Sequence, residues 1–147
     1  MCSYCGCESI TVIGRFMAEH EAVIDACGDL RRACSGGPLD VTTAARRLTA
    51  LLRPHTAAEE AGLFALLGED PEFRDHIATL CDEHQALEDA LAAVAAGDVA
   101  RMPAFELALR RHIDREENGL FPAAAVRFAG PEWDQVVLLT PAAGPPA

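Results

Sequence analysis

Apolar residues recur at helical spacing along four long stretches of the chain. In the first stretch Ile13, Phe16, Val23 and Cys27 fall on one stripe, because residues three and four positions apart share a helix face. The same periodicity continues through three further stretches. The predicted helices cover about residues 10–33, 40–68, 70–97 and 102–122, followed by a short helix at about 130–139.

Turn and cap residues separate these stretches. Gly36-Gly37-Pro38 ends the first helix, and Asp70 followed by Pro71 is a typical helix start. Pro54 lies inside the second helix, where it either kinks the axis before His55 or marks a break. In the short last helix Trp133, Val137 and Leu138 are expected to cover one end of the molecule.

Four long helices with short connections predict an all-α fold, an up-down-up-down four-helix bundle with a short C-terminal helix. The expected organisation is a cysteine-containing arm at 1–9, one bundle domain at 10–139, and a tail at 140–147. The tail is rich in Pro, Ala and Gly, so we expect it to be disordered.

Composition narrows the functional classes. A chain of 147 residues is long enough for one domain with a substantial core. A net charge of −11 argues against a nucleic-acid or membrane partner. No apolar run approaches the length of a transmembrane helix, and the N-terminus lacks the features of a signal peptide. The expected location is the cytoplasm, where the six cysteines are thiols or ligands rather than disulfides.

One motif occurs twice. Residues 55–64 read HTAAEEAGLF and residues 112–121 read HIDREENGLF, so both follow H-x3-E-E-x-G-L-F. Each His lies on the same helix face as the first Glu of its motif, because residues four apart are neighbours on a helix. The Leu and Phe that close each motif continue this face into the core. Two such helices facing each other would present two imidazoles and two carboxylates to one interior point.

A shorter repeat adds two histidines, since Glu19-His20 is echoed by Glu83-His84. The chain therefore reads as two helical hairpins related by a pseudo-twofold axis. Burying so many polar groups without partners would be costly, so we expect a metal site. His76 lies about 12 Å along the helix from His84 and is excluded. The expected ligands are His20, His55, Glu59, His84, His112 and Glu116.

The ligand set predicts which metal is bound. Six ligands exceed the needs of one tetrahedral zinc ion, and mixed imidazole and carboxylate donors suit iron or manganese. Two glutamates from facing helices can bridge two ions. The sequence therefore predicts a dinuclear centre.

The N-terminal arm carries a second candidate chemistry. Cys2, Cys5 and Cys7 could bind zinc with a fourth ligand from elsewhere, act in redox or regulatory chemistry, or simply pack. Tyr4 lies among them and could supply a phenolate ligand or a radical relay if the arm folds back.

The combination of motifs resembles the hemerythrin-like, or HHE cation-binding, family over roughly residues 10–135. The ligand pattern H, H-x3-E, H, H-x3-E is similar to that of members whose N-termini carry a comparable cysteine arm, found in actinobacteria. The resemblance implies a non-heme centre of two iron ions with an oxo or hydroxo bridge, held by the same six residues.

The chain departs from the oxygen-carrying hemerythrins at one ligand. These have H-x3-H on the third helix, whereas this chain has Glu88 at the position of that fifth histidine. Glu88 is either a ligand or a residue of the surroundings or access route. Glu60 and Glu117 lie one position off the ligand face, so we expect them to orient imidazoles or to be solvated.

A more open, carboxylate-rich site is expected to turn over its ligand rather than carry it. We therefore expect an oxidoreductase that decomposes hydrogen peroxide, as a catalase does, or a related small oxidant such as nitric oxide. Glu59 and Glu116 would bridge the ions and Glu88 could move protons. The alternative is a binding protein that senses O2, redox state or iron without turnover. The expected partners are a small oxidant and at most a second copy of the chain, as monomer or homodimer.

Overall fold

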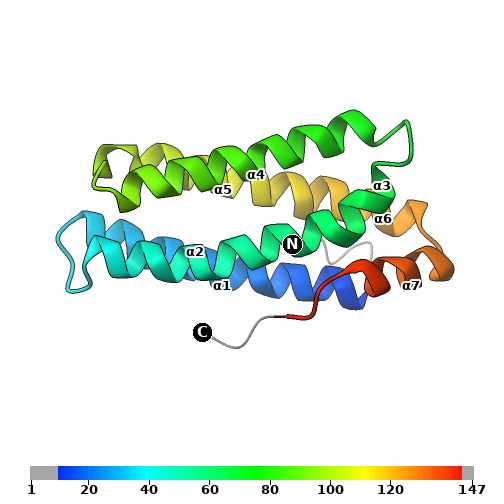
Figure 1. The fold of residues 1–147 in the computed structure, drawn as a ribbon, viewed down its shortest axis with the longest axis horizontal. Helices are drawn as coiled ribbons and strands as arrows, with labels where there is room; N and C mark the ends of the chain where they lie inside the picture. The colour runs from blue at the N-terminus through cyan, green and yellow to red at the C-terminus, as the bar shows by residue number, and fades with distance from the viewer. Residues whose placement is uncertain (1–9, 144–147) are drawn as a thin grey trace.

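The computed structural model describes residues 10–143, and within this range the fold is entirely helical (Figure 1). The element order is α1 (Thr11–Cys34), α2 (Val41–Glu59), η2 (Glu60–Phe64), α3 (Ala65–Leu67), α4 (Arg74–Ala95), η3 (Val99–Arg101), α5 (Met102–Arg115), η4 (Glu116–Leu120), α6 (Phe121–Arg127) and α7 (Gly130–Leu139). Elements α2, η2 and α3 follow one another without a break, as do η3 to α6, so the chain forms four long helices and one short one. The predicted four-helix bundle with a short C-terminal helix is confirmed.

The predicted turn signals act mostly as expected. Gly36 takes a left-handed φ of +87° just after α1, a conformation that glycine adopts without strain. The Asp40 side chain accepts a hydrogen bond from the Thr43 amide at 2.8 Å and so caps α2. Helix α2 runs unbroken through Pro54. The third helix starts later than predicted, at Arg74, because residues 70–73 form a turn in which the Asp70 carboxylate accepts from the Glu72 amide.

Two π-helical turns, which the sequence did not predict, lie at matching places in the two halves. They are η2 and η4, and each begins at a glutamate of the repeated motif. A π-turn closes its hydrogen bond one residue later than an α-turn and recurs at functional sites. The Leu and Phe that close each repeated motif are almost fully buried, as predicted.

The core divides into two apolar clusters along the bundle. One is built around Phe16, Phe64 and Phe121 at the end that carries α7, and the other around Leu48 and Phe105 at the opposite end. Between them six polar side chains are buried to 5 % exposure or less: His20, His55, Glu59, His84, His112 and Glu116. A polar layer therefore crosses an otherwise apolar bundle.

Helix α7 packs against η2 at one end of the bundle (Figure 1). It also joins the apolar cluster that contains Val12 and Ile13 of α1. Its buried residue is Val136, with Trp133 partly buried against Phe128. The prediction that Val137 and Leu138 cover the bundle is wrong, because they are 54 % and 81 % exposed. The short helix turns Val136 inward instead.

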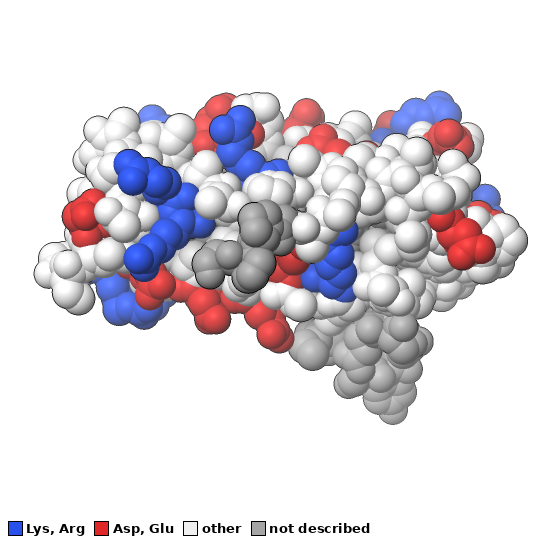
Figure 2. Space-filling model, turned by 60° about the horizontal axis from the view of Figure 1, so that its bottom comes forward, with Lys and Arg blue, Asp and Glu red and all other residues white. Residues whose placement is uncertain are grey.

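The charged surface is uneven. On the face shown in Figure 2 the largest group of basic side chains, all of them arginines, lies at the left, the end with the α1–α2 turn, and smaller groups lie toward the other end. None of the helices in residues 10–143 is both long enough and apolar enough to cross a membrane.

Candidate metal centre

The helices bring all six predicted ligands to one place in the interior. His20 comes from α1, His55 and Glu59 from α2, His84 from α4, and His112 and Glu116 from α5 and η4. Two groups can be drawn, each with its ligand atoms within 4.8 Å of one another. One contains His20, His55, Glu59 and Glu116, and the other contains Glu59, His84, His112 and Glu116.

The two carboxylates belong to both groups. Glu59 Oε1 lies 3.2 Å from His55 Nε2 and 3.3 Å from His84 Nε2. Glu116 Oε1 lies 3.0 Å from His20 Nε2, and its Oε2 lies 3.2 Å from His112 Nε2. Each of the two carboxylates therefore lies close to one histidine of each group.

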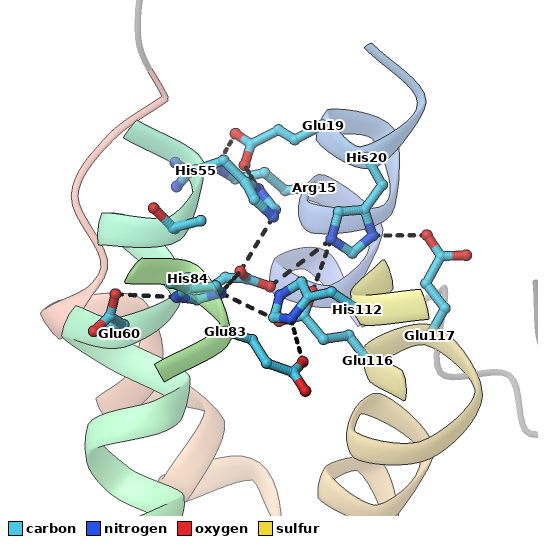
Figure 3. Close-up of polar contacts among 12 residues, drawn as sticks. Arg15, Glu19, His20, His55, Glu60, Glu83, His84, His112, Glu116 and Glu117 are labelled. Atoms are coloured by element: carbon cyan, nitrogen blue, oxygen red, sulfur yellow. Dashed lines mark hydrogen bonds and ion pairs between the residues drawn. The ribbon is translucent and has the colours of Figure 1, made fainter. Parts of the chain in front are cut away.

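Each imidazole is also held from outside by a second carboxylate (Figure 3). The Nδ1 atoms of His55 and His112 each lie 2.8 Å from a carboxylate oxygen of Glu19 and Glu83. Because an ionised carboxylate only accepts, Nδ1 carries the hydrogen and donates it. The Nε2 lone pair of a neutral imidazole is then free to face the interior, as a metal ligand requires.

The other two imidazoles are held in the same way. His84 Nδ1 lies 3.0 Å from Glu60 Oε2, and His20 Nδ1 lies 2.7 Å from Glu117 Oε2. Glu60 and Glu117 thus take the orienting role that was one of their two sequence-based alternatives. Under the pseudo-twofold relation the pairs Glu60–His84 and Glu117–His20 are equivalent.

Sequence reasoning missed Glu19 and Glu83 as parts of this site. A signal was present, because the dipeptide Glu-His occurs at both places. Each of these carboxylates also pairs with an arginine. Arg15 Nε lies 3.0 Å from Glu19 Oε2, and an Arg115 nitrogen contacts Glu83 Oε2. Arginine holds both carboxylates in position to accept from the imidazoles. Burial raises the pKa of Glu19, but the hydrogen bonds from His55 and Arg15 outweigh it and lower that pKa.

The carboxylates change the acid–base properties of the imidazoles. Burial lowers the pKa of His20, but the close approach of Glu116 and the hydrogen bond to Glu117 outweigh it and raise the pKa to about 9. Burial is likewise outweighed at His55 and His84, whose pKa values are raised to about 10 by Glu59 and neighbouring carboxylates. Burial raises the pKa of Glu116, yet the surrounding imidazoles hold it well below its usual range.

The inward-facing atoms lack hydrogen-bond partners within the described residues. They are the Nε2 atoms of His20, His84 and His112 and both carboxylate oxygens of Glu59 and of Glu116. Some approach one another to 3.0–3.3 Å, but none is in hydrogen-bonding geometry. Fully buried carboxylates without partners are costly, and cations between the donors would satisfy them. The donor set therefore fits bound metal ions.

The remaining candidates lie elsewhere. Glu88 is in neither group; its carboxylate lies 3.0 Å from Arg53 Nε and is 43 % exposed. His76 is exposed, as expected for a residue away from the site. Tyr4, Cys2, Cys5 and Cys7 lie outside the described residues.

Comparison with protein families agrees with this geometry. The family model described as the hemerythrin HHE cation binding domain matches residues 11–124. Comparison with curated proteins and with solved structures gave no match. The matched range covers most of the chain and contains all six buried His and Glu residues. The chain therefore belongs to the hemerythrin HHE cation-binding domain family.

Proposed function

We propose that the protein binds two iron ions and decomposes hydrogen peroxide. The observation that carries the proposal is the evenness of the two ligand groups, each with two histidines and the same two shared glutamates. One ion would be held by His20 and His55 and the other by His84 and His112, with Glu59 and Glu116 common to both.

Mixed imidazole and carboxylate donors are typical of non-heme iron. Two histidines and a carboxylate recur at iron sites that keep open positions for a small oxidant. In this chain both groups have that composition, so neither ion would be saturated by histidine. Two iron ions with the same ligand composition, both with open positions for a small oxidant, favour catalytic turnover over reversible binding of that oxidant.

Bound iron would supply the electron transfer, in which one peroxide gives up two electrons and two protons to become O2 and a second takes them up to become two waters. The chain contributes the arrangement. The four outer carboxylates keep a proton on every Nδ1 and direct every Nε2 inward. The apolar clusters on both sides keep bulk water from the polar layer.

Small oxidants have a route to the site between α2 and α4. A cavity of about 110 Å³ lies there, lined by His84, Glu88, Arg53 and Thr56 among others. This volume accommodates molecules the size of water or hydrogen peroxide. Glu88 is the carboxylate of this lining and would exchange protons between solvent and the site.

The proposal is tested by metal content, an ultraviolet–visible spectrum and an oxygen electrode. We expect two irons per chain, bands of a bridged iron pair, and sustained O2 release after peroxide addition. Glu116→Ala should abolish O2 release, whereas Glu72→Ala, at an exposed residue away from the site, should not. Circular dichroism of both variants checks folding.

Other outcomes distinguish the alternatives. Two irons with a reversible spectral change under O2 and no O2 release from peroxide would overturn the enzyme proposal and support a sensing or binding protein. Consumption of nitric oxide but not of peroxide would identify nitric oxide, rather than hydrogen peroxide, as the substrate. Zinc, or no metal after growth and purification in iron-replete conditions, would refute both functions.

A further inference from the structure

A groove lined by α4 and α5 lies outside the six buried His and Glu residues of the metal centre. It has a volume of about 540 Å³. Leu87 and Phe105 form its floor at 3 % and 1 % exposure, and alanines form its walls: Ala86, Ala90, Ala104 and Ala108. These six residues give the groove an apolar surface, and Glu83, Arg101, Arg111 and Arg115 complete its lining.

The internal repeat shows how the groove differs from the matching face of the α1–α2 pair. In the α1–α2 pair the matching positions carry Ala44 and Ala58, each 1 % exposed and packed between helices. In α5 these positions carry Arg101 and Arg115. Guanidinium groups are not buried without partners, so these two side chains stay partly outside the helix contact, at 62 % exposure for Arg101 and 48 % for Arg115.

A second exchange leaves the space unfilled. The α2 residues Arg47 and Leu51 correspond to Ala104 and Ala108 of α5. Large side chains on one hairpin are thus replaced by methyl groups on the other.

The charges at the groove identify the class of ligand. Glu83 is the single carboxylate of the lining, and it is already neutralised by Arg115 and by the Nδ1–H of His112. Arg101 pairs with Asp98 at 2.9 Å. Arg111 makes no ion pair with any residue of 10–143, so one guanidinium remains available.

We propose that this groove binds a free long-chain carboxylate, with its carboxylate on Arg111 and its chain along the alanine walls toward Arg101. Guanidinium recognises carboxylate through two parallel hydrogen bonds. Arg111 and Arg101 are ten residues apart, which gives the chain about 15 Å of helix to lie on. A groove of this volume is within the usual range for small-molecule sites.

A second copy of the chain is a poorer occupant. A twofold contact through this face would place the arginines of one copy against those of the other. The ligand that matches the Arg111 guanidinium and the apolar surface of the groove is an amphiphile with one negative charge.

The test is calorimetric titration of the full-length protein with dodecanoate below its micelle concentration. Affinity should rise about fourfold for each methylene added from octanoate upward and level off when the chain fills the groove. Dodecanol and acetate, which lack the charge and the chain, should bind far more weakly. Comparable binding of dodecanol would overturn the role of Arg111.

Two matched pairs of variants locate the site. Arg111→Gln should weaken dodecanoate binding tenfold or more, while Arg110→Gln, whose arginine pairs with Glu106 outside the groove, should not. Ala108→Leu introduces the residue that the repeat carries at 51 and should abolish binding. Ala50→Leu, at an exposed position whose repeat counterpart is Leu107, should leave it unchanged.

Melting curves confirm that each variant folds. Unchanged binding in Ala108→Leu, or binding of an acidic helical peptide without binding of dodecanoate, would refute the proposal. The readout does not depend on iron or peroxide, so it stands or falls separately from the proposed enzyme activity.

Discussion

The repeated motif contains a glycine in each half, and the structure predicts opposite effects of replacing them. A Cβ added at Gly62 would lie 2.2 Å from Thr140 Oγ1 and 2.9 Å from the Val136 carbonyl oxygen. The Thr140 side chain can rotate, but the Val136 carbonyl belongs to the backbone of α7. At Gly119 no atom of residues 10–143, apart from chain neighbours and the backbone of the same helix, lies within 4 Å of the added Cβ. Gly62→Ala must therefore displace α7, and Gly119→Ala meets open space.

The change in the free energy of unfolding can be worked out for each variant from the apolar surface that it exposes or the backbone entropy that it changes. Displacing α7 uncovers Val136, which is 0 % exposed, and removing a buried valine from its apolar surroundings costs about 1.5–3 kcal/mol. Gly119→Ala should instead stabilise by about 0.5–1 kcal/mol, since alanine loses less entropy in a helix. The two variants should differ by about 2–4 kcal/mol, or roughly 4–16 °C in Tm for a chain of this size.

The assay is thermal and urea unfolding of both variants and the parent protein, all freed of metal by a chelator. Adding Thr140→Ala to Gly62→Ala removes the nearer of the two clashing atoms and should recover part of the loss. Equal stability of Gly62→Ala and Gly119→Ala would refute the reasoning, because it would mean that α7 does not pack closely on η2.

Three further predictions concern the metal centre. Glu83→Gln should weaken metal affinity about 10–100-fold in competition with a chromophoric chelator, because His112 Nδ1 loses its ionised acceptor, whereas exposed Glu72→Gln should have no effect. Metal loading at pH 7 should release protons to an indicator dye. Imidazoles with pKa values raised to about 9–10 must lose a proton before Nε2 can bind a metal ion. Metal loading without proton release would contradict this prediction. The raised pKa values of His20, His55 and His84 stabilise the metal-free fold fully below their unfolded value of about 6.5, and this contribution is lost as pH rises through 9–10. The urea midpoint of metal-free protein should therefore fall between pH 7 and pH 10, and a constant midpoint would count against these shifts.

Much of the site could be predicted because it depends on spacing along single helices. His55 and Glu59 share a face wherever the helix forms, and so do His112 and Glu116. The repeat placed His20 and His84 in matching frames, and apolar periodicity placed the four helices. These features require only the geometry of one helix and the need to bury its apolar stripe.

The partners across helices could not be predicted in this way. Glu19 lies beside His20 in the chain, yet its carboxylate accepts from His55 on the neighbouring helix, and Glu83 does the same with His112. Which imidazole a carboxylate reaches depends on the rotation and spacing of two packed helices, and sequence spacing on one helix contains neither.

The same limit applies to residues that look identical in the repeat. Gly62 and Gly119 occupy equal positions in the motif, but only Gly62 lies under α7. The α4–α5 groove likewise depends on how two helices pack, because residues of both α4 and α5 line it. Local periodicity along the sequence determined the helices and the ligand faces; packing between distant segments decided which side chains meet, because those contacts depend on every element that surrounds them.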